Sequence, residues 1–104
     1  MSAVDPMVRD IVEAHGQAVA DGDMQRALED FTQAGAQHPN TGPTVAELPQ
    51  PVKTATVKRL DQQSDGSYIA HVQYGGDEKS TTVRSVWEQV GDRPYITSVS
   101  VVDE

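Results

Sequence analysis

The chain has 104 residues, with 16 acidic and eight basic side chains for a net charge of −8, and it contains no cysteine. This length supports one domain over residues 1–104, and the lack of cysteine excludes disulfides, thiolate catalysis and cysteine-ligated metals. The acidic balance argues against a nucleic-acid partner, and no apolar run approaches the ~20 residues of a membrane span, so we expect a cytoplasmic protein with no membrane contact.

The first predicted element is a helix that opens at Asp5-Pro6, because Asp caps free N–H groups and Pro suits the first helical position. Gly22 ends it. The mostly apolar residues of this segment recur at the spacing of one helical face, which is typical of a helix that buries a single side. These residues are Val8, Ile11, Val12, His15 and Val19.

A second helix is expected from a cap at Asp23 to about Ala34. Residues 35–51 are interrupted by proline and glycine, so they cannot form a long element. Within them, Thr44 and Glu47 have the spacing of a capping box, which predicts one helical turn through Leu48.

After residue 52 the apolar period changes from 3.6 to 2, which is typical of β-strands. The connections between these strands are short turns, so successive strands must be antiparallel. The sequence therefore predicts an α+β fold, with two N-terminal helices and a short helical turn packed on a curved four-stranded meander. The four strand segments are residues 53–60, 68–74, 83–88 and 96–102.

The order of these pieces resembles the NTF2-like superfamily (SnoaL-like or ketosteroid isomerase-like, cystatin-type α+β). The similar segments are residues 19–24, 27–31, 85–88 and 93–96. The resemblance implies a cone-shaped sheet around a helix, with a pocket at its open end, in a family that includes enzymes, non-enzymatic binders and dimerisation modules. That family's third helix is reduced here to the short segment 35–51.

The resemblance also implies where a catalytic site would lie. His15 stands where isomerase members have an oxyanion-donating Tyr, His38 precedes Pro39 where they have a catalytic Asp, and Ser85 replaces a second acid. Because all three groups are replaced, no catalytic residue is assigned and steroid-type isomerisation is not expected. His15 and His38 are the two candidates for acid–base work.

We expect the pocket to be mostly apolar with a few polar groups, as small-molecule sites usually are. If the turn at residues 91–93 is of the two-residue kind, pairing across it would place Ser98 near Ser85 and Trp87 near Ile96. A one-residue slip in register would reverse the faces of the last strand. His15 and Trp87 are alternatively core residues, and His38 a solvated loop residue. Gly16 indicates either close helix–sheet packing or room for a ligand beside His15. The expected lining is His15, Tyr68, Ser85, Trp87 and Ser98.

Metal and cofactor sites are not predicted. His15, His38 and His71 show no ligand spacing, and His71 is expected on the face of the sheet opposite the pocket. The chain has neither a Gly-x-Ser-x-Gly elbow nor a glycine-rich phosphate loop.

The convex face of the sheet mixes apolar and polar side chains, which suits a subunit interface. We expect a homodimer through this face, with the acidic helices pointing outward to keep it soluble. The residues expected there are Ile69, His71, Gln73, Arg84, Val86, Thr97, Val99 and Val101.

Three functional hypotheses follow from the sequence. The first is an NTF2-like domain that binds a small organic molecule without catalysis. The second is a small isomerase- or hydratase-type enzyme that uses His15, with or without His38. The third is an interaction module whose cone is filled by its own side chains, including Trp87.

Overall fold

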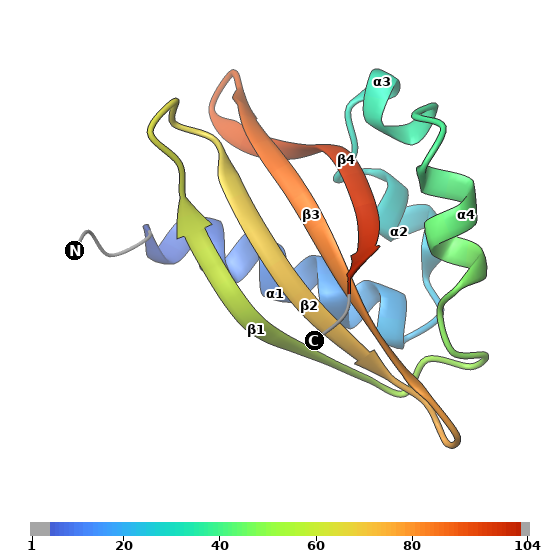
Figure 1. Ribbon diagram of the computed structural model, residues 1–104. Coiled ribbons are helices and arrows are strands. Elements are labelled where there is room, and N and C mark those ends of the chain that lie inside the picture. The colour runs from blue at the N-terminus through green and yellow to red at the C-terminus, as the bar shows by residue number, and fades with distance from the viewer. Residues whose placement is uncertain (1–4, 103–104) are drawn as a thin grey trace.

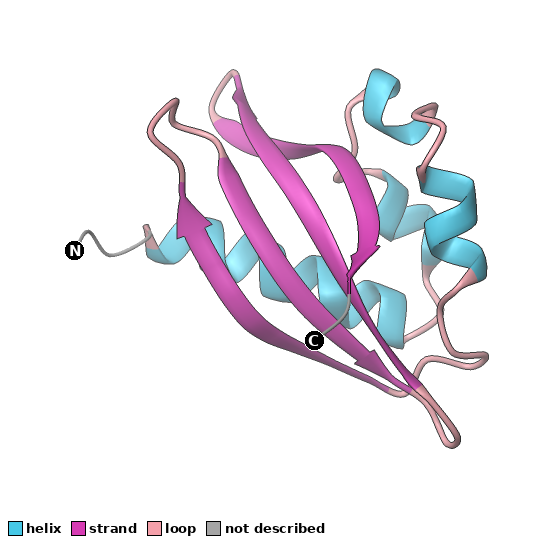
Figure 2. Ribbon diagram, viewed as in Figure 1, coloured by secondary structure: helices cyan, strands magenta, loops and turns pink. Residues whose placement is uncertain are grey.

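The structure is a computed structural model that describes residues 5–102. Its four strands form one antiparallel sheet in the order β1-β2-β3-β4, and the helices cover one side of that sheet (Figures 1 and 2). This confirms the predicted α+β meander. In chain order the elements are α1 (Pro6–Ala20), α2 (Met24–Leu28), α3 (Gln33–Ala36), α4 (Thr41–Ala46), β1 (Thr54–Gln62), β2 (Tyr68–Gly75), β3 (Ser80–Val90) and β4 (Arg93–Val102).

Helix α1 forms where the sequence predicts it. The Asp5 side chain accepts a hydrogen bond from the backbone N–H of Met7 at 2.8 Å, and Pro6 occupies the first turn. Its apolar face packs across β1 and β2. At Gly16 an added Cβ would lie 3.1 Å from the Cβ of Ala55, so this glycine allows close helix–sheet packing.

The second helix is much shorter than predicted, because it ends at Leu28 rather than near Ala34. The next residues hydrogen-bond to β4 instead: the N–H of Ile96 donates to the carbonyl of Asp30, and Ile96 accepts from the N–H of Thr32. Phe31 therefore forms a parallel bridge with Ile96. Local helix propensity was overridden by pairing with a strand more than 60 residues later.

The helical turn begins four residues earlier than predicted, because its N-cap is Asn40 and not Thr44. Helix α4 starts at Thr41 after Asn40, so Thr44 lies inside the helix and the expected capping box with Glu47 does not form. Helices α3 and α4 both pack on β4. The helical layer thus has α1 over β1 and β2, α2 beside α1, and α3 and α4 against β4 (Figure 1).

The last hairpin has a two-residue turn, which was the condition for the predicted pairing, and Trp87 pairs with Ile96 as predicted. A bulge between Val86 and Trp87 then shifts the register, so Ser98 pairs with Val86, and Ser85 pairs with Val99. Because an extra residue reverses the alternation of side chains, the predicted proximity of Ser98 to Ser85 is wrong.

Because of the same bulge, two residues predicted on the convex face do not lie there. Val99 pairs with Ser85, and Val101 pairs with Val83, so both valines lie on the helix-covered face. Arg84 and Val86 stay on the convex face, where they pair with Ser100 and Ser98. That face is therefore more polar than the sequence indicated.

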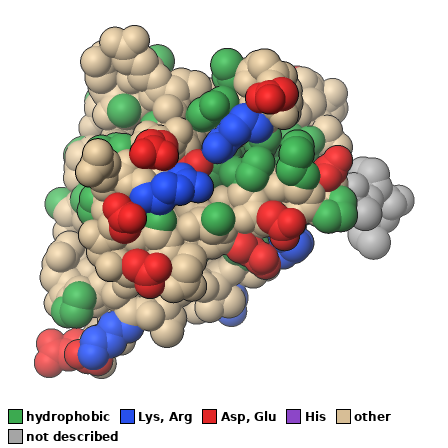
Figure 3. Space-filling view, turned by 180° about the vertical axis from the view of Figure 1, so that it is seen from behind, with side chains coloured by type: hydrophobic (Ala, Val, Ile, Leu, Met, Phe, Trp, Pro, Cys, Tyr) green, Lys and Arg blue, Asp and Glu red, His purple; other side chains and the backbone are tan. Residues whose placement is uncertain are grey.

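Figure 3 views the molecule from the helical side, where acidic side chains are spread among basic and hydrophobic ones. Seven of the eight acidic residues in the first fifty are exposed, as expected of an outward-facing acidic layer. The exception is Asp30, whose exposure is 0 %. A fully buried carboxylate needs compensating partners, and these partners define the site described below.

Candidate functional site

A buried histidine and a buried aspartate meet at the interface between the helices and the sheet. His15 projects from α1, and its Nδ1 lies 3.0 Å from Oδ2 of Asp30, which follows α2. Both residues are buried. The pair forms because the segment after α2 hydrogen-bonds to β4, which fixes Asp30 against α1.

Two arginines complete the partners of Asp30. Arg26 donates to Oδ2 at 3.1 Å, and Arg93 donates to Oδ1 at 2.8 Å. Burial by itself raises the pKa of Asp30, but the hydrogen bonds from His15, Arg93 and Arg26 outweigh it and lower the pKa from 3.8 to about 2. Asp30 is therefore ionised at neutral pH.

The Asp30 carboxylate fixes the orientation of the His15 ring. An ionised carboxylate can only accept hydrogen bonds, so Nδ1 of His15 carries the shared proton. The ring also makes edge contacts with Phe31 and Trp87, with centroid separations of 5.9 and 5.6 Å. These contacts hold the imidazole in one position and leave Nε2 as its second polar atom.

Nε2 of His15 forms no hydrogen bond with any residue of 5–102. Every fully enclosed side-chain nitrogen or oxygen in that range has a partner, so Nε2 is not sealed inside the core. The hydroxyls of Thr44 and Tyr74 likewise have no hydrogen-bond partner within 5–102 and are not sealed inside the core. All three residues line one recess.

The recess is a groove with a cavity volume of about 50 Å³ between α1, α2, α4 and the sheet. Three of its lining residues, Met24, Leu28 and Val45, are large hydrophobics with exposed side chains at the surface. The groove is therefore a mostly apolar opening that leads inward to His15. It is lined by His15, Val19, Met24, Ala27, Leu28, Phe31, Thr41, Thr44, Val45, Leu48, Tyr74, Val83 and Val99.

Of the five residues predicted to line a pocket, His15 alone lines this groove. Trp87 is fully buried, and its indole N–H donates to the Ser85 hydroxyl at 2.8 Å. Ser85 and Trp87 thus satisfy one another inside the core, where Tyr68 is also buried opposite Trp87. Ser98 lies on the convex face.

The other candidate histidine is not brought to the groove. His38 lies in the loop between α3 and α4, where its Nδ1 accepts a hydrogen bond from the N–H of Asn40 at 3.1 Å. His71 lies on the convex face as predicted, since it pairs with Arg84. The structure therefore brings together His15 and Asp30, and not His15 and His38.

Sequence reasoning missed Asp30 and its two arginines. The one local signal was the i,i+4 spacing of Arg26 and Asp30, which is common on solvated helix faces and would not have indicated burial. The pairing of Asp30 with Arg93, 63 residues later, has no local signal at all.

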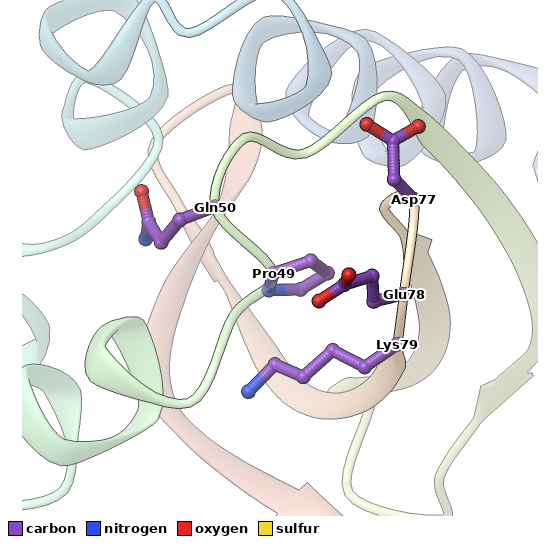
Figure 4. Close-up of a pocket in the computed structure, with 5 residues that line it drawn as sticks. All are labelled: Pro49, Gln50, Asp77, Glu78 and Lys79. Carbon is purple, nitrogen blue, oxygen red and sulfur yellow. The ribbon is translucent and has the colours of Figure 1, made fainter.

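A larger depression of about 490 Å³ lies beside the β2–β3 hairpin (Figure 4). It is lined by Pro49, Gln50, Asp77, Glu78 and Lys79, and all except Pro49 are exposed. Its charged groups are therefore exposed to solvent, unlike His15, and Asp77 pairs with Lys53 at 3.1 Å on the surface. We place the candidate site in the groove and not here.

Within residues 5–102, no helix has the length and apolar character needed to cross a membrane. In the same part of the chain, no three His, Asp or Glu side chains are grouped as a metal ion would require. Comparisons with protein-family models, curated proteins and solved structures found no match. The NTF2-like resemblance accordingly stays a prediction.

Proposed function

We propose that this protein binds one small, mostly apolar organic molecule in the groove beside His15 and does not transform it. The observation that carries the proposal is a buried, oriented imidazole on the wall of an apolar recess, whose Nε2 has no hydrogen-bond partner among residues 5–102. Small-molecule sites have this make-up, with apolar walls and a few placed polar groups. The exposed Met24, Leu28 and Val45 give the ligand an apolar entrance.

The test is a thermal-shift screen with a broad set of small organic molecules. We expect some compounds to raise the Tm of the wild type, and expect His15→Ala to abolish that rise. His38→Ala is the matched control, because His38 lies in a loop away from the groove and should leave the rise intact. If no compound stabilises the wild type, the interior is simply filled by its own side chains and the proposal fails.

A second candidate function is acid–base catalysis by His15, and the His15–Asp30 hydrogen bond favours it. A carboxylate that holds Nδ1 leaves Nε2 free to take a proton, as in His–Asp pairs of hydrolases. Binding is preferred because no Asp or Glu is among the residues that line the groove, so no carboxyl group can serve there as a second acid or base. Turnover of a carbonyl substrate that survived both His15→Ala and His38→Ala would exclude this enzyme.

The homodimer and the cytoplasmic location stay predictions. The convex face carries Arg84 and Val86 as expected, but Ser98 and Ser100 lie there in place of Val99 and Val101. The face therefore offers less apolar area to a second copy. Light scattering after size exclusion measures the mass directly, and a monomer would refute the dimer.

A further inference from the structure

The polarity of the hydrogen bonds at His15 restricts the class of ligand that the groove can hold. Nδ1 lies 3.0 Å from the ionised Asp30 carboxylate, so it must donate. In the neutral form of the ring, Nε2 then presents a lone pair and no proton. A ligand group that meets Nε2 of the neutral ring must therefore supply the donor.

We propose that the ligand is a slender, unbranched apolar chain that ends in a hydroxyl group, and that this hydroxyl donates a hydrogen bond to Nε2 of His15. The inference rests on the proposed function and adds the chemical class of the ligand to it. A terminal hydroxyl is compact and neutral, and it both donates and accepts.

Two further hydroxyls in the groove favour an alcohol. Thr44 and Tyr74 line the same recess, and neither side chain has a hydrogen-bond partner within 5–102. Burial raises the pKa of Tyr74, so its hydroxyl keeps its proton and stays a donor. The groove thus holds an acceptor at His15 and donors elsewhere on its lining, which matches the two-sided hydrogen bonding of an alcohol.

Other polar end groups fit less well. Ethers and carbonyls have no proton to offer Nε2, so contact with them would leave the lone pair unsatisfied. A carboxylate would bring a charge into a largely apolar recess, which is costly without a paired cation. Arg26 and Arg93 are not among the lining residues, and both hydrogen-bond to Asp30.

The size of the groove favours a chain over a ring. Its cavity volume is about 50 Å³, whereas an apolar cavity that holds benzene measures ~150 Å³. The end of an alkyl chain is narrower than a ring and can reach inward without displacing the lining. The rest of the chain would then lie over Met24, Leu28 and Val45, whose exposed side chains it would cover.

The experiment titrates the full chain at pH 8 with matched probes and follows the backbone amide signals of the groove by NMR. The probes are 1-butanol, 1-hexanol, cyclohexanol, methyl pentyl ether and hexanoate. We expect 1-hexanol to bind about tenfold more tightly than the ether, because one neutral hydrogen bond contributes about this much to the affinity. Each added methylene should tighten binding about fourfold. The ¹⁵N signal of Nε2 should shift with the alcohols alone.

The variant His15→Phe keeps an aromatic ring and removes the acceptor, so it should bind hexanol and the ether equally. His38→Phe is the control and should keep the tenfold preference, because His38 is outside the groove. If His15→Phe does not fold, the wild-type comparison of alcohol with ether decides alone. Equal binding of both, or tightest binding of hexanoate or cyclohexanol, would overturn this inference while leaving the binding function intact. If no probe shifts any groove signal, the inference fails. If the thermal-shift screen also finds no stabilising compound, the proposed function fails as well.

Discussion

Replacing Asp30 by Asn removes the charge at the centre of the buried cluster while keeping the size of the side chain. The lowering of its pKa from 3.8 to about 2 corresponds to about 2 kcal/mol of stability at neutral pH. In Asn an N–H₂ group replaces one carboxylate oxygen, and this group cannot accept a hydrogen bond. Part of the hydrogen bonding from His15, Arg26 and Arg93 is therefore lost. We expect Asp30→Asn to lower the free energy of unfolding by about 2–4 kcal/mol.

The effect should depend on pH in a defined direction. Because the pKa of Asp30 is lower in the folded protein than in the unfolded chain, its contribution is complete well above pH 4 and is lost as the pH falls towards 2. At pH 3 about half of the charge contribution should remain, which is about 1 kcal/mol. The difference between wild type and variant should shrink accordingly.

Urea denaturation at pH 7 and pH 3, followed by the fluorescence of the single tryptophan, measures both free energies. Asp61→Asn is the matched control, because Asp61 also accepts from an arginine at 3.0 Å but lies exposed on the surface. Such a pair contributes about 0–1 kcal/mol. The reasoning is refuted if the two variants lose equal stability at pH 7, or if the Asp30→Asn deficit is the same at both pH values.

Three further predictions test the packing and the register. Gly35→Ala should cost about 1–3 kcal/mol in urea denaturation because its Cβ would collide with a backbone oxygen of β4, whereas Gly42→Ala, with open space around it, should cost far less. Ser85→Ala should cost about 1–3 kcal/mol, since it leaves the buried indole N–H without its acceptor; an unchanged midpoint would show that this hydrogen bond is unimportant. Val99→Asp should prevent stable folding while Ser98→Asp is tolerated, as judged by circular dichroism, and the opposite result would mean that the bulge is absent.

Most of the architecture could be predicted because its signals are local. Asp5-Pro6 and the apolar spacing define α1, and the two-residue turn at 91–92 sets the pairing of Trp87 with Ile96. Those signals act between residues a few positions apart. The same reasoning correctly placed His71 on the convex face, since alternation in β2 is uninterrupted.

The errors arose where distant segments interact. The second helix stops at Leu28 because the following residues pair with β4, and that competing interaction leaves no trace in residues 24–34 themselves. The bulge at Val86 and Trp87 moved Ser98 to the opposite face, and one inserted residue is enough to reverse a strand.

For the site, the sequence by itself determined that His15 lies on the inner face of the first helix, because its spacing matches that of the apolar positions. The tertiary structure alone decided what His15 can do. Asp30 reaches it from another segment, Arg93 balances that carboxylate from the last hairpin, and the short helices leave an apolar groove beside Nε2. Local periodicity fixes which side of an element faces inward, whereas the partners it meets there depend on how separate segments pack.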